Sequence, residues 1–344
     1  MASINEAVAL AIEHQKAGRL QEAEALYRQI LQVNPSHPDA LHLLGMVAYQ
    51  VGKYEIALDF VSQAIRHNAQ APLYHSNIGE ILRLLGKLSD AEVHLREAVK
   101  LDPNYADARN NLGLVLYGQG KTEDAVVEYR NSLAINPAYA GAHNNLGTAL
   151  KVLGRPDEAI AHYRQAVALK PDFAEARSNL GVVLQEQGRL EEAIAQHREA
   201  LALKPGYVDA FYNLGVALRL HGKLEEAVAM YCQALSLNPS CVRAYNNLGV
   251  LLQGQGKFAE AAEQYHLALK HKPDHGEAYC NLGITLMEQG LLEEAAACYR
   301  RALALKPDLV TAHSNLLFCL HYDTAHDSTE VVTQCREWYE RYAR

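Results

Sequence analysis

Asparagine recurs in the tetrapeptide NNLG or a close variant of it. A carboxamide offers two N–H donors and one carbonyl acceptor, so it can bind the N–H and C=O of one peptide unit whatever the side chain of that unit. A series of carboxamides could therefore hold an extended polypeptide by its backbone. The recurring asparagines are Asn77, Asn111, Asn145, Asn179, Asn213, Asn247, Asn281 and Asn315.

These asparagines are costly where they stand, because asparagine in a helix interior loses ~0.5–0.7 kcal/mol relative to alanine. Two explanations remain open at this point. The asparagines bind a peptide backbone, or they make local hydrogen bonds that serve the structure alone. The unbroken run of eight favours peptide binding, so we treat them as candidate peptide-binding residues.

Other stretches suggest chemistry but do not support it. The segment YGQGKTEDA at 117–125 resembles a phosphate-binding loop, but Val115 stands where that motif requires glycine. No set of nucleophile, base and orienting acid stands out, and neither does a pair of carboxylates. We therefore expect no enzyme activity in this chain, and no cofactor.

Histidines could bind a metal ion at two places. His271 and His275 are four residues apart, but Pro273 between them prevents a shared helix face. A single loop could also supply ligands, although a solvated connector is the favoured interpretation. The ligands from this loop would be His321, Asp323, His326 and Asp327.

The elements that position the asparagines follow from a period of 34 residues. Nine repeats begin at residues 4, 38, 72, 106, 140, 174, 208, 242 and 276. Glycine occupies position 8 in repeats 2–9 and position 15 in all nine, alanine occupies position 20, and proline occupies position 32 except at Ala69. Position 6 holds the asparagine.

Each repeat predicts two helices. Apolar residues at positions 3, 7, 10 and 11 have amphipathic helical spacing, and glycine at position 15 ends that helix. A second apolar stripe runs through positions 20, 24, 27 and 28, and the proline at position 32 ends it. Small residues at positions 8 and 20 predict a close approach of the two backbones. The hairpins must stack to bury their apolar faces, which predicts an all-α solenoid.

This pattern resembles the tetratricopeptide repeat over residues 4–309, which we assign as nine repeats. The resemblance implies a right-handed superhelix whose first helices, and with them the asparagines, line an inner groove. Repeat 1 departs from the pattern with Ala9 and Ala11, as expected of an end repeat. A tenth first helix starts at Val310, but Leu317 replaces its glycine.

Residues 310–344 form a separate region with the partial tenth repeat and a final helix. Asp327 and Glu330 have capping-box spacing before that helix. A helix that caps the last repeat is the favoured interpretation, and a connector into another domain is the alternative. The residues expected on one face of it are Val331, Cys335, Trp338 and Tyr342.

The segment AHSNLLFCLHYD at 312–323, with REWYERYAR after it, resembles the junction in bacterial relatives of the protein O-linked N-acetylglucosamine transferases. In that family a tetratricopeptide superhelix precedes the glycosyltransferase region, and matching asparagines grip substrate polypeptide. The resemblance implies a transferase domain in cis beyond Arg344, so no catalytic residue is carried over. The alternative is a stand-alone scaffold without such a domain.

Two further positions lie on the asparagine stripe. Position 9 is mostly apolar, at Leu114, Val182, Val216, Val250 and Ile284, which either pack against the next repeat or contact ligand side chains. Position 2 is often acidic, and its carboxylates either complement the helix N-terminus or form an acidic groove edge. These residues are Asp39, Asp107, Glu175, Asp209 and Glu277.

Composition limits the partners. The net charge is −8, with 32 basic and 40 acidic residues, which disfavours nucleic acid. No apolar run is long enough to span a membrane, and no signal peptide is recognisable. The six cysteines lack C-x-x-C pairs and predict a reduced, cytoplasmic protein. We expect extended polypeptide as partner, and a tyrosine-rich convex face with incompletely covered ends would permit a homodimer.

Overall fold

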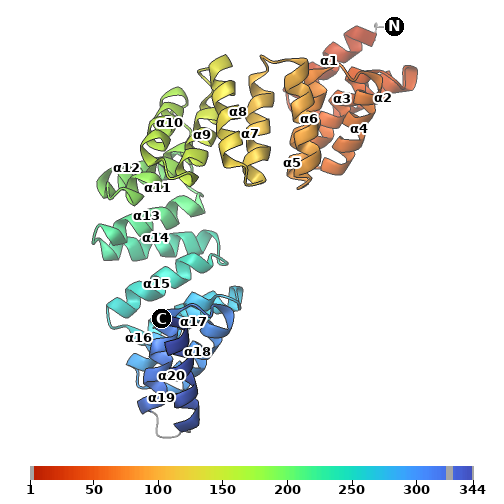
Figure 1. Cartoon of the computed structure of the whole chain (residues 1–344). Coiled ribbons are helices and arrows are strands. Elements are labelled where there is room, and N and C mark those ends of the chain that lie inside the picture. Colours follow the sequence, from red (N-terminus) through yellow and green to blue (C-terminus); the bar gives the residue numbers. More distant parts are fainter. Residues whose placement is uncertain (1–3, 323–327, 343–344) are drawn as a thin grey trace. The chain divides into compact units, whose positions relative to one another are not determined.

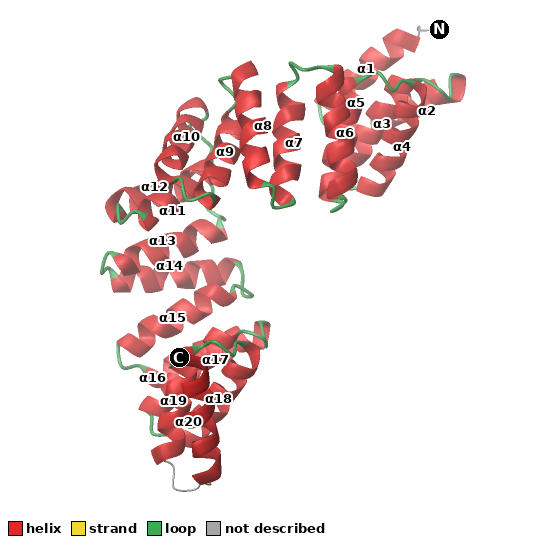
Figure 2. Cartoon of the chain, viewed as in Figure 1, coloured by secondary structure: helices red, strands yellow, loops and turns green. Residues whose placement is uncertain are grey.

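The computed structural model describes residues 4–322 and 328–342, and every regular element in those ranges is an α-helix (Figure 2). The chain divides into two compact bodies, Met1–Val183 and Leu184–Arg344. The helices of the N-terminal body are α1 (Ile4–Lys16), α2 (Leu20–Val33), α3 (Pro38–Gln50), α4 (Tyr54–His67), α5 (Pro72–Leu84), α6 (Leu88–Leu101), α7 (Ala106–Gly118), α8 (Thr122–Ile135), α9 (Ala140–Val152) and α10 (Pro156–Leu169).

Helix α11 (Ala174–Glu186) begins in the first body and ends in the second. The helices of the C-terminal body are α12 (Leu190–Leu203), α13 (Val208–Leu220), α14 (Leu224–Leu237), α15 (Val242–Gly254), α16 (Phe258–His271), α17 (Gly276–Glu288), α18 (Leu292–Leu305), α19 (Val310–Tyr322) and α20 (Ser328–Tyr342).

Within each body the helices form stacked hairpins (Figure 1). The two helices of a repeat pack on each other, as α3 does on α4 and α13 on α14. The second helix also packs on the first helix of the next repeat, as α4 does on α5 and α14 on α15. The prediction of an all-α chain of stacked helix hairpins is therefore confirmed.

Backbone geometry explains where the helices end. All nine glycines at position 15 have φ between 70° and 83°, a left-handed conformation that glycine adopts without strain. The residue at position 31 is extended, as at Asp102 before Pro103, with φ −134° and ψ 95°. Asn68 adopts the same geometry before Ala69, and its Oδ1 accepts a hydrogen bond from the Gln70 N–H at 3.1 Å. Proline is thus sufficient but not necessary to end the second helix.

Glycine at position 8 has a different reason from the one expected. A Cβ on Gly113 would lie 2.5 Å from Cε1 of Tyr129, and a Cβ on Gly79 would lie 2.5 Å from Cγ of Leu95. The glycine therefore makes room for the buried side chain at position 24. At Gly45 the carbonyl oxygen of Ala57 would also lie close to the added Cβ, at 3.2 Å.

The final helix α20 packs on α19. Trp338 Nε1 donates a hydrogen bond to Ser314 Oγ at 3.3 Å, Tyr342 OH donates to the carbonyl of Pro307 at 3.0 Å, and Val331 contacts the core of the last repeats. Cys335 is predicted to lie on this packed face, but it is exposed, so that prediction is wrong for Cys335. Asp327 and the side chain of Glu330, the predicted capping box, lie outside the described residues.

Candidate functional site

The eight asparagines lie on the first helices of repeats 3–9 and on α19, and each side chain is half-buried. Four of them belong to each compact body. Because their spacing is 34 residues, each occupies the same place on its own helix.

Five of the asparagine amides bind the preceding repeat. Each Nδ2 donates to the side chain 35 residues earlier, which is position 5 of the repeat before. The bonds run from Asn145 to Asn110 Oδ1 (2.9 Å), from Asn179 to Asn144 Oδ1 (3.0 Å), from Asn281 to Asn246 Oδ1 (3.0 Å), from Asn247 to Tyr212 OH (3.1 Å) and from Asn77 to His42 Nε2 (2.8 Å).

Sequence reasoning missed the role of position 5. A signal was present in the doublets Asn110-Asn111, Asn144-Asn145 and Asn246-Asn247, where two adjacent carboxamides recur. In each bond the donor uses one of its two N–H groups, and a carboxamide has a second N–H and a carbonyl besides. The inter-repeat bond therefore fixes the orientation of the amide without exhausting its capacity.

His42 is the position-5 acceptor that could change its charge. It is buried and stacks on Tyr74 with ring centroids 4.5 Å apart. Burial lowers the pKa of His42 to about 4, so its ring is neutral at pH 7. Since its Nε2 accepts from Asn77, the proton of the neutral ring lies on Nδ1.

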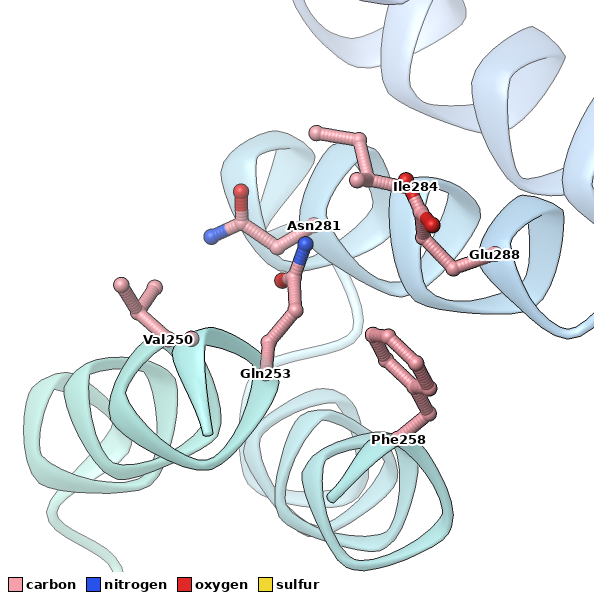
Figure 3. A pocket seen from close by; sticks show the side chains of 7 residues that line it. Val250, Gln253, Phe258, Asn281, Ile284 and Glu288 are labelled. Atoms are coloured by element: carbon pink, nitrogen blue, oxygen red, sulfur yellow. The ribbon is translucent and has the colours of Figure 1, made fainter. Parts of the chain in front are cut away.

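An open pocket of about 500 Å³ lies beside Asn281 in the C-terminal body. Two position-9 residues, Val250 and Ile284, line it, and Val250 is 38% exposed. At this place apolar position-9 side chains and a candidate asparagine border one space (Figure 3). The other lining residues are Gln253, Gly254, Phe258 and Glu288.

Position-2 carboxylates bind either the next repeat or their own. Asp209 pairs with Arg243 of the next repeat at 2.8 Å, whereas Glu277 pairs with Lys306 of the same repeat at 2.7 Å. The hydrogen bond from Lys306 lowers the pKa of Glu277. Asp39 accepts a hydrogen bond from the hydroxyl of Tyr74. The contacts of Asp209 and Asp39 give these two carboxylates an inter-repeat role that neither sequence-based explanation included.

Two of the buried tyrosines at position 24 donate hydrogen bonds to glutamines on the first helix of their own repeat. Tyr27 OH donates to Gln15 Oε1 at 3.0 Å, and Tyr265 OH donates to Gln253 Oε1 at 3.2 Å. Repeats 2 and 3 carry Val61 and Leu95 instead of tyrosine. Repeat 6 also lacks the tyrosine. It carries fully buried His197 at this position, and neither of the histidine's ring nitrogens has a hydrogen-bond partner among the described residues. The equivalent glutamine oxygen, Gln185 Oε1, is also buried and unpaired there.

The suggested metal ligands separate in the structure. His271 ends α16, whereas His275 precedes α17 and accepts a hydrogen bond from the Ala278 N–H at 3.1 Å. Of the proposed loop ligands, Asp323, His326 and Asp327 lie outside the described residues. Across residues 4–322 and 328–342, no three His, Cys, Asp or Glu side chains gather as a metal site.

Comparison with known proteins agrees with this geometry. A family model described as "Cilia and flagella-associated protein 70 C-terminal domain", a tetratricopeptide domain, matches residues 2–211. Two tetratricopeptide repeat models match residues 247–309 and 217–256. The chain belongs to the tetratricopeptide repeat family. The tetratricopeptide repeat is typical of scaffolds for protein–protein interaction.

Individual relatives of this tetratricopeptide chain are distant. Human tetratricopeptide repeat protein 7B is 28% identical over 69 residues, which is 20% of this chain and only 8% of the length of that relative. A pilF structure from Pseudomonas aeruginosa is 26% identical, with a TM-score of 0.55 over 61% of this chain and 95% of its own.

A chain of the APC/C hetero-tetramer Cut9-Hcn1 is 17% identical, with a TM-score of 0.62 over 89% of this chain and 60% of its own. At this identity it shows the fold alone. No helix among the described residues is both long and apolar enough to cross a bilayer.

Proposed function

We propose that this chain binds extended polypeptide through the asparagines at position 6. The observation that carries the proposal is the set of five inter-repeat bonds that orient these amides. A pre-oriented amide loses little side-chain entropy on binding, which favours affinity. Its second N–H and its carbonyl match the acceptor and donor of a peptide unit.

Half-burial of the asparagines supports the same proposal. A side chain that is partly exposed can reach a ligand, and its buried part stays anchored by the preceding repeat. The pocket beside Asn281 would accept a ligand side chain while the amide binds the backbone. Recognition of the backbone predicts broad tolerance of peptide sequence, with modest preference from such pockets.

The test must separate ligand binding from the inter-repeat bond. We expect alanine at Asn145, Asn179, Asn247 and Asn281 to reduce binding to an array of unrelated unstructured peptides by at least tenfold. The matched control removes the acceptors of the same four bonds and keeps the asparagines. It carries Asn110→Ala, Asn144→Ala, Tyr212→Phe and Asn246→Ala.

Both variants lose the same four bonds, each worth about 0.5–1.5 kcal/mol, so their unfolding midpoints should fall by similar amounts. Circular dichroism should show equal helicity for both. The control keeps the amides and loses only their orientation, so peptide binding that falls much less in the control than in the asparagine variant supports the proposal. Equal binding by the two variants would assign the asparagines to structure alone.

We further propose, on the resemblance of residues 312–344 alone, that the chain presents substrate to a glycosyltransferase domain of the O-linked N-acetylglucosamine transferase type. Polypeptide held along the asparagines would then be delivered toward that domain. The reading frame after Arg344 tests this. A stop codon there would favour the alternative, a stand-alone tetratricopeptide scaffold in the cytoplasm that can act as a homodimer.

A further inference from the structure

Two equivalent histidine pairs lie in the N-terminal body, and each joins the two helices of one repeat. In repeat 3, Nδ1 of His75 on α5 is 3.1 Å from Nδ1 of His94 on α6. In repeat 5, Nδ1 of His143 on α9 is 3.0 Å from Nδ1 of His162 on α10. Both pairs occupy positions 4 and 23 of their repeats, so the same constellation occurs twice.

Backbone carbonyls set the tautomer of one ring in each pair. Nε2 of His75 is 3.1 Å from the carbonyl oxygen of Ala69, and Nε2 of His143 is 3.1 Å from that of Pro137. A carbonyl only accepts, so each Nε2 carries the proton and the neutral ring turns the lone pair of its Nδ1 to the other histidine. Metal-binding histidines commonly donate their second N–H to a backbone carbonyl in this way.

We propose that each pair binds one divalent transition cation, with Zn²⁺ as the reference ion, through its two Nδ1 atoms. Zn–N bonds of about 2.0–2.1 Å in tetrahedral geometry place the two nitrogens about 3.3 Å apart, so each pair needs to open only slightly. Proton balance is simple. The ring at position 23 moves its proton from Nδ1 to Nε2, and the neutral pair releases none.

Charge and burial suit a cation at these places. Burial and the neighbouring histidine lower the pKa values of His94 and His162, so both rings are uncharged near pH 7 and can coordinate. Since no third ligand is already gathered among the described residues, water would complete each site. Two protein ligands predict an affinity well below that of structural zinc sites.

The two sites should differ in strength. Asp90 lies one helical turn before His94, so its carboxylate can approach a cation in repeat 3. The equivalent Glu158 in repeat 5 is held by Arg155 at 2.6 Å and by Arg130 at 3.4 Å. The repeat-3 site should therefore bind more tightly.

The tetratricopeptide fold itself does not require histidine at positions 4 and 23. Repeat 4 has Arg109 and Glu128 there, joined at 3.1 Å. Repeat 2 has Leu41 and Phe60. Apolar, ionic and imidazole pairs all occur at these positions, so the packing of the two helices does not dictate histidine.

Calorimetric titration with ZnCl₂ tests the proposal on the tag-free chain with exposed Cys232 and Cys335 replaced by serine. We expect two sites. His94→Gln should remove the tighter one, His162→Gln the weaker one, and the double variant both. Glutamine is a conservative choice because repeats 6 and 8 carry Gln196 and Gln264 at position 23.

Two further variants test the ligand argument. Asp90→Asn should weaken the repeat-3 site about tenfold, the low end of what loss of a supporting carboxylate costs a metal site. Arg155→Gln should strengthen the repeat-5 site, because it removes the closer of the two arginines that hold Glu158. Absence of Zn²⁺ binding at millimolar concentration, or a double variant that binds as the parent does while circular dichroism shows it folded, would overturn the proposal.

Discussion

Replacement of Gly249 by alanine is expected to lower the free energy of unfolding by about 3 kcal/mol, the upper range for overpacking a core. The new Cβ would lie 2.6 Å from Cε1 and 2.8 Å from Cζ of Tyr265. That ring is fully buried, and its hydroxyl is held by Gln253 at 3.2 Å, so it cannot move aside without losing a bond. Urea unfolding followed by circular dichroism measures the change.

Gly254→Ala is the matched control, because Gly254 ends the same helix and a Cβ there meets nothing within 4 Å. Alanine is the better helix former and restricts the unfolded chain, so we expect a gain of up to about 1 kcal/mol. Opposite signs for the two substitutions would show that position 8 is glycine because of the ring at position 24. A loss of similar size in both would refute that explanation.

Replacement of His197 by tyrosine is expected to stabilise the protein at pH 7 by about 1–2 kcal/mol, the value of satisfying a buried acceptor. The histidine is fully buried, and neither its ring nitrogens nor Gln185 Oε1 has a hydrogen-bond partner in the described part of the chain. The tyrosines of repeats 1 and 8 bond to the glutamine equivalent to Gln185. A hydroxyl at residue 197 could therefore donate a hydrogen bond to Gln185 Oε1.

The same substitution should change the dependence of stability on pH. Burial lowers the pKa of His197 from 6.5 to about 4. Between these values the unfolded chain binds a proton that the folded chain does not, so stability is retained above pH 6.5 and lost as pH falls toward 4. The loss reaches about 3 kcal/mol, and about 2 kcal/mol is already lost at pH 5.

Tyrosine does not titrate in this range, so the advantage of His197→Tyr should grow by that amount from pH 7 to pH 5. Urea midpoints of the parent and the variant at both pH values give the difference. Other histidines, such as His42, contribute equally to both proteins and cancel. A variant that is less stable at pH 7, or a constant difference across pH, would show that residue 197 is not the source of this acid sensitivity.

Periodicity made most of the fold predictable from sequence. Apolar spacing located both helices of every repeat, and glycine at position 15 marked where the first helix ends, because only glycine adopts φ near 75° without strain. The stacking of hairpins followed from the need to bury two apolar stripes. These are local or nearest-neighbour effects, and the residues that produce them recur in all nine repeats.

The sequence alone also determined which residues to suspect, because the asparagines at position 6 stand out against helix propensity. Only the tertiary structure decided what they contact. Asn145 reaches Asn110, and His75 reaches His94, across helix–helix interfaces whose rotation no periodicity specifies. It also decided that Gly249 faces a ring and that the His197 ring has no hydrogen-bond partner among the described residues. These side-chain contacts depend on rotamers at packed interfaces, and the rotamers are fixed only when the helices pack against each other.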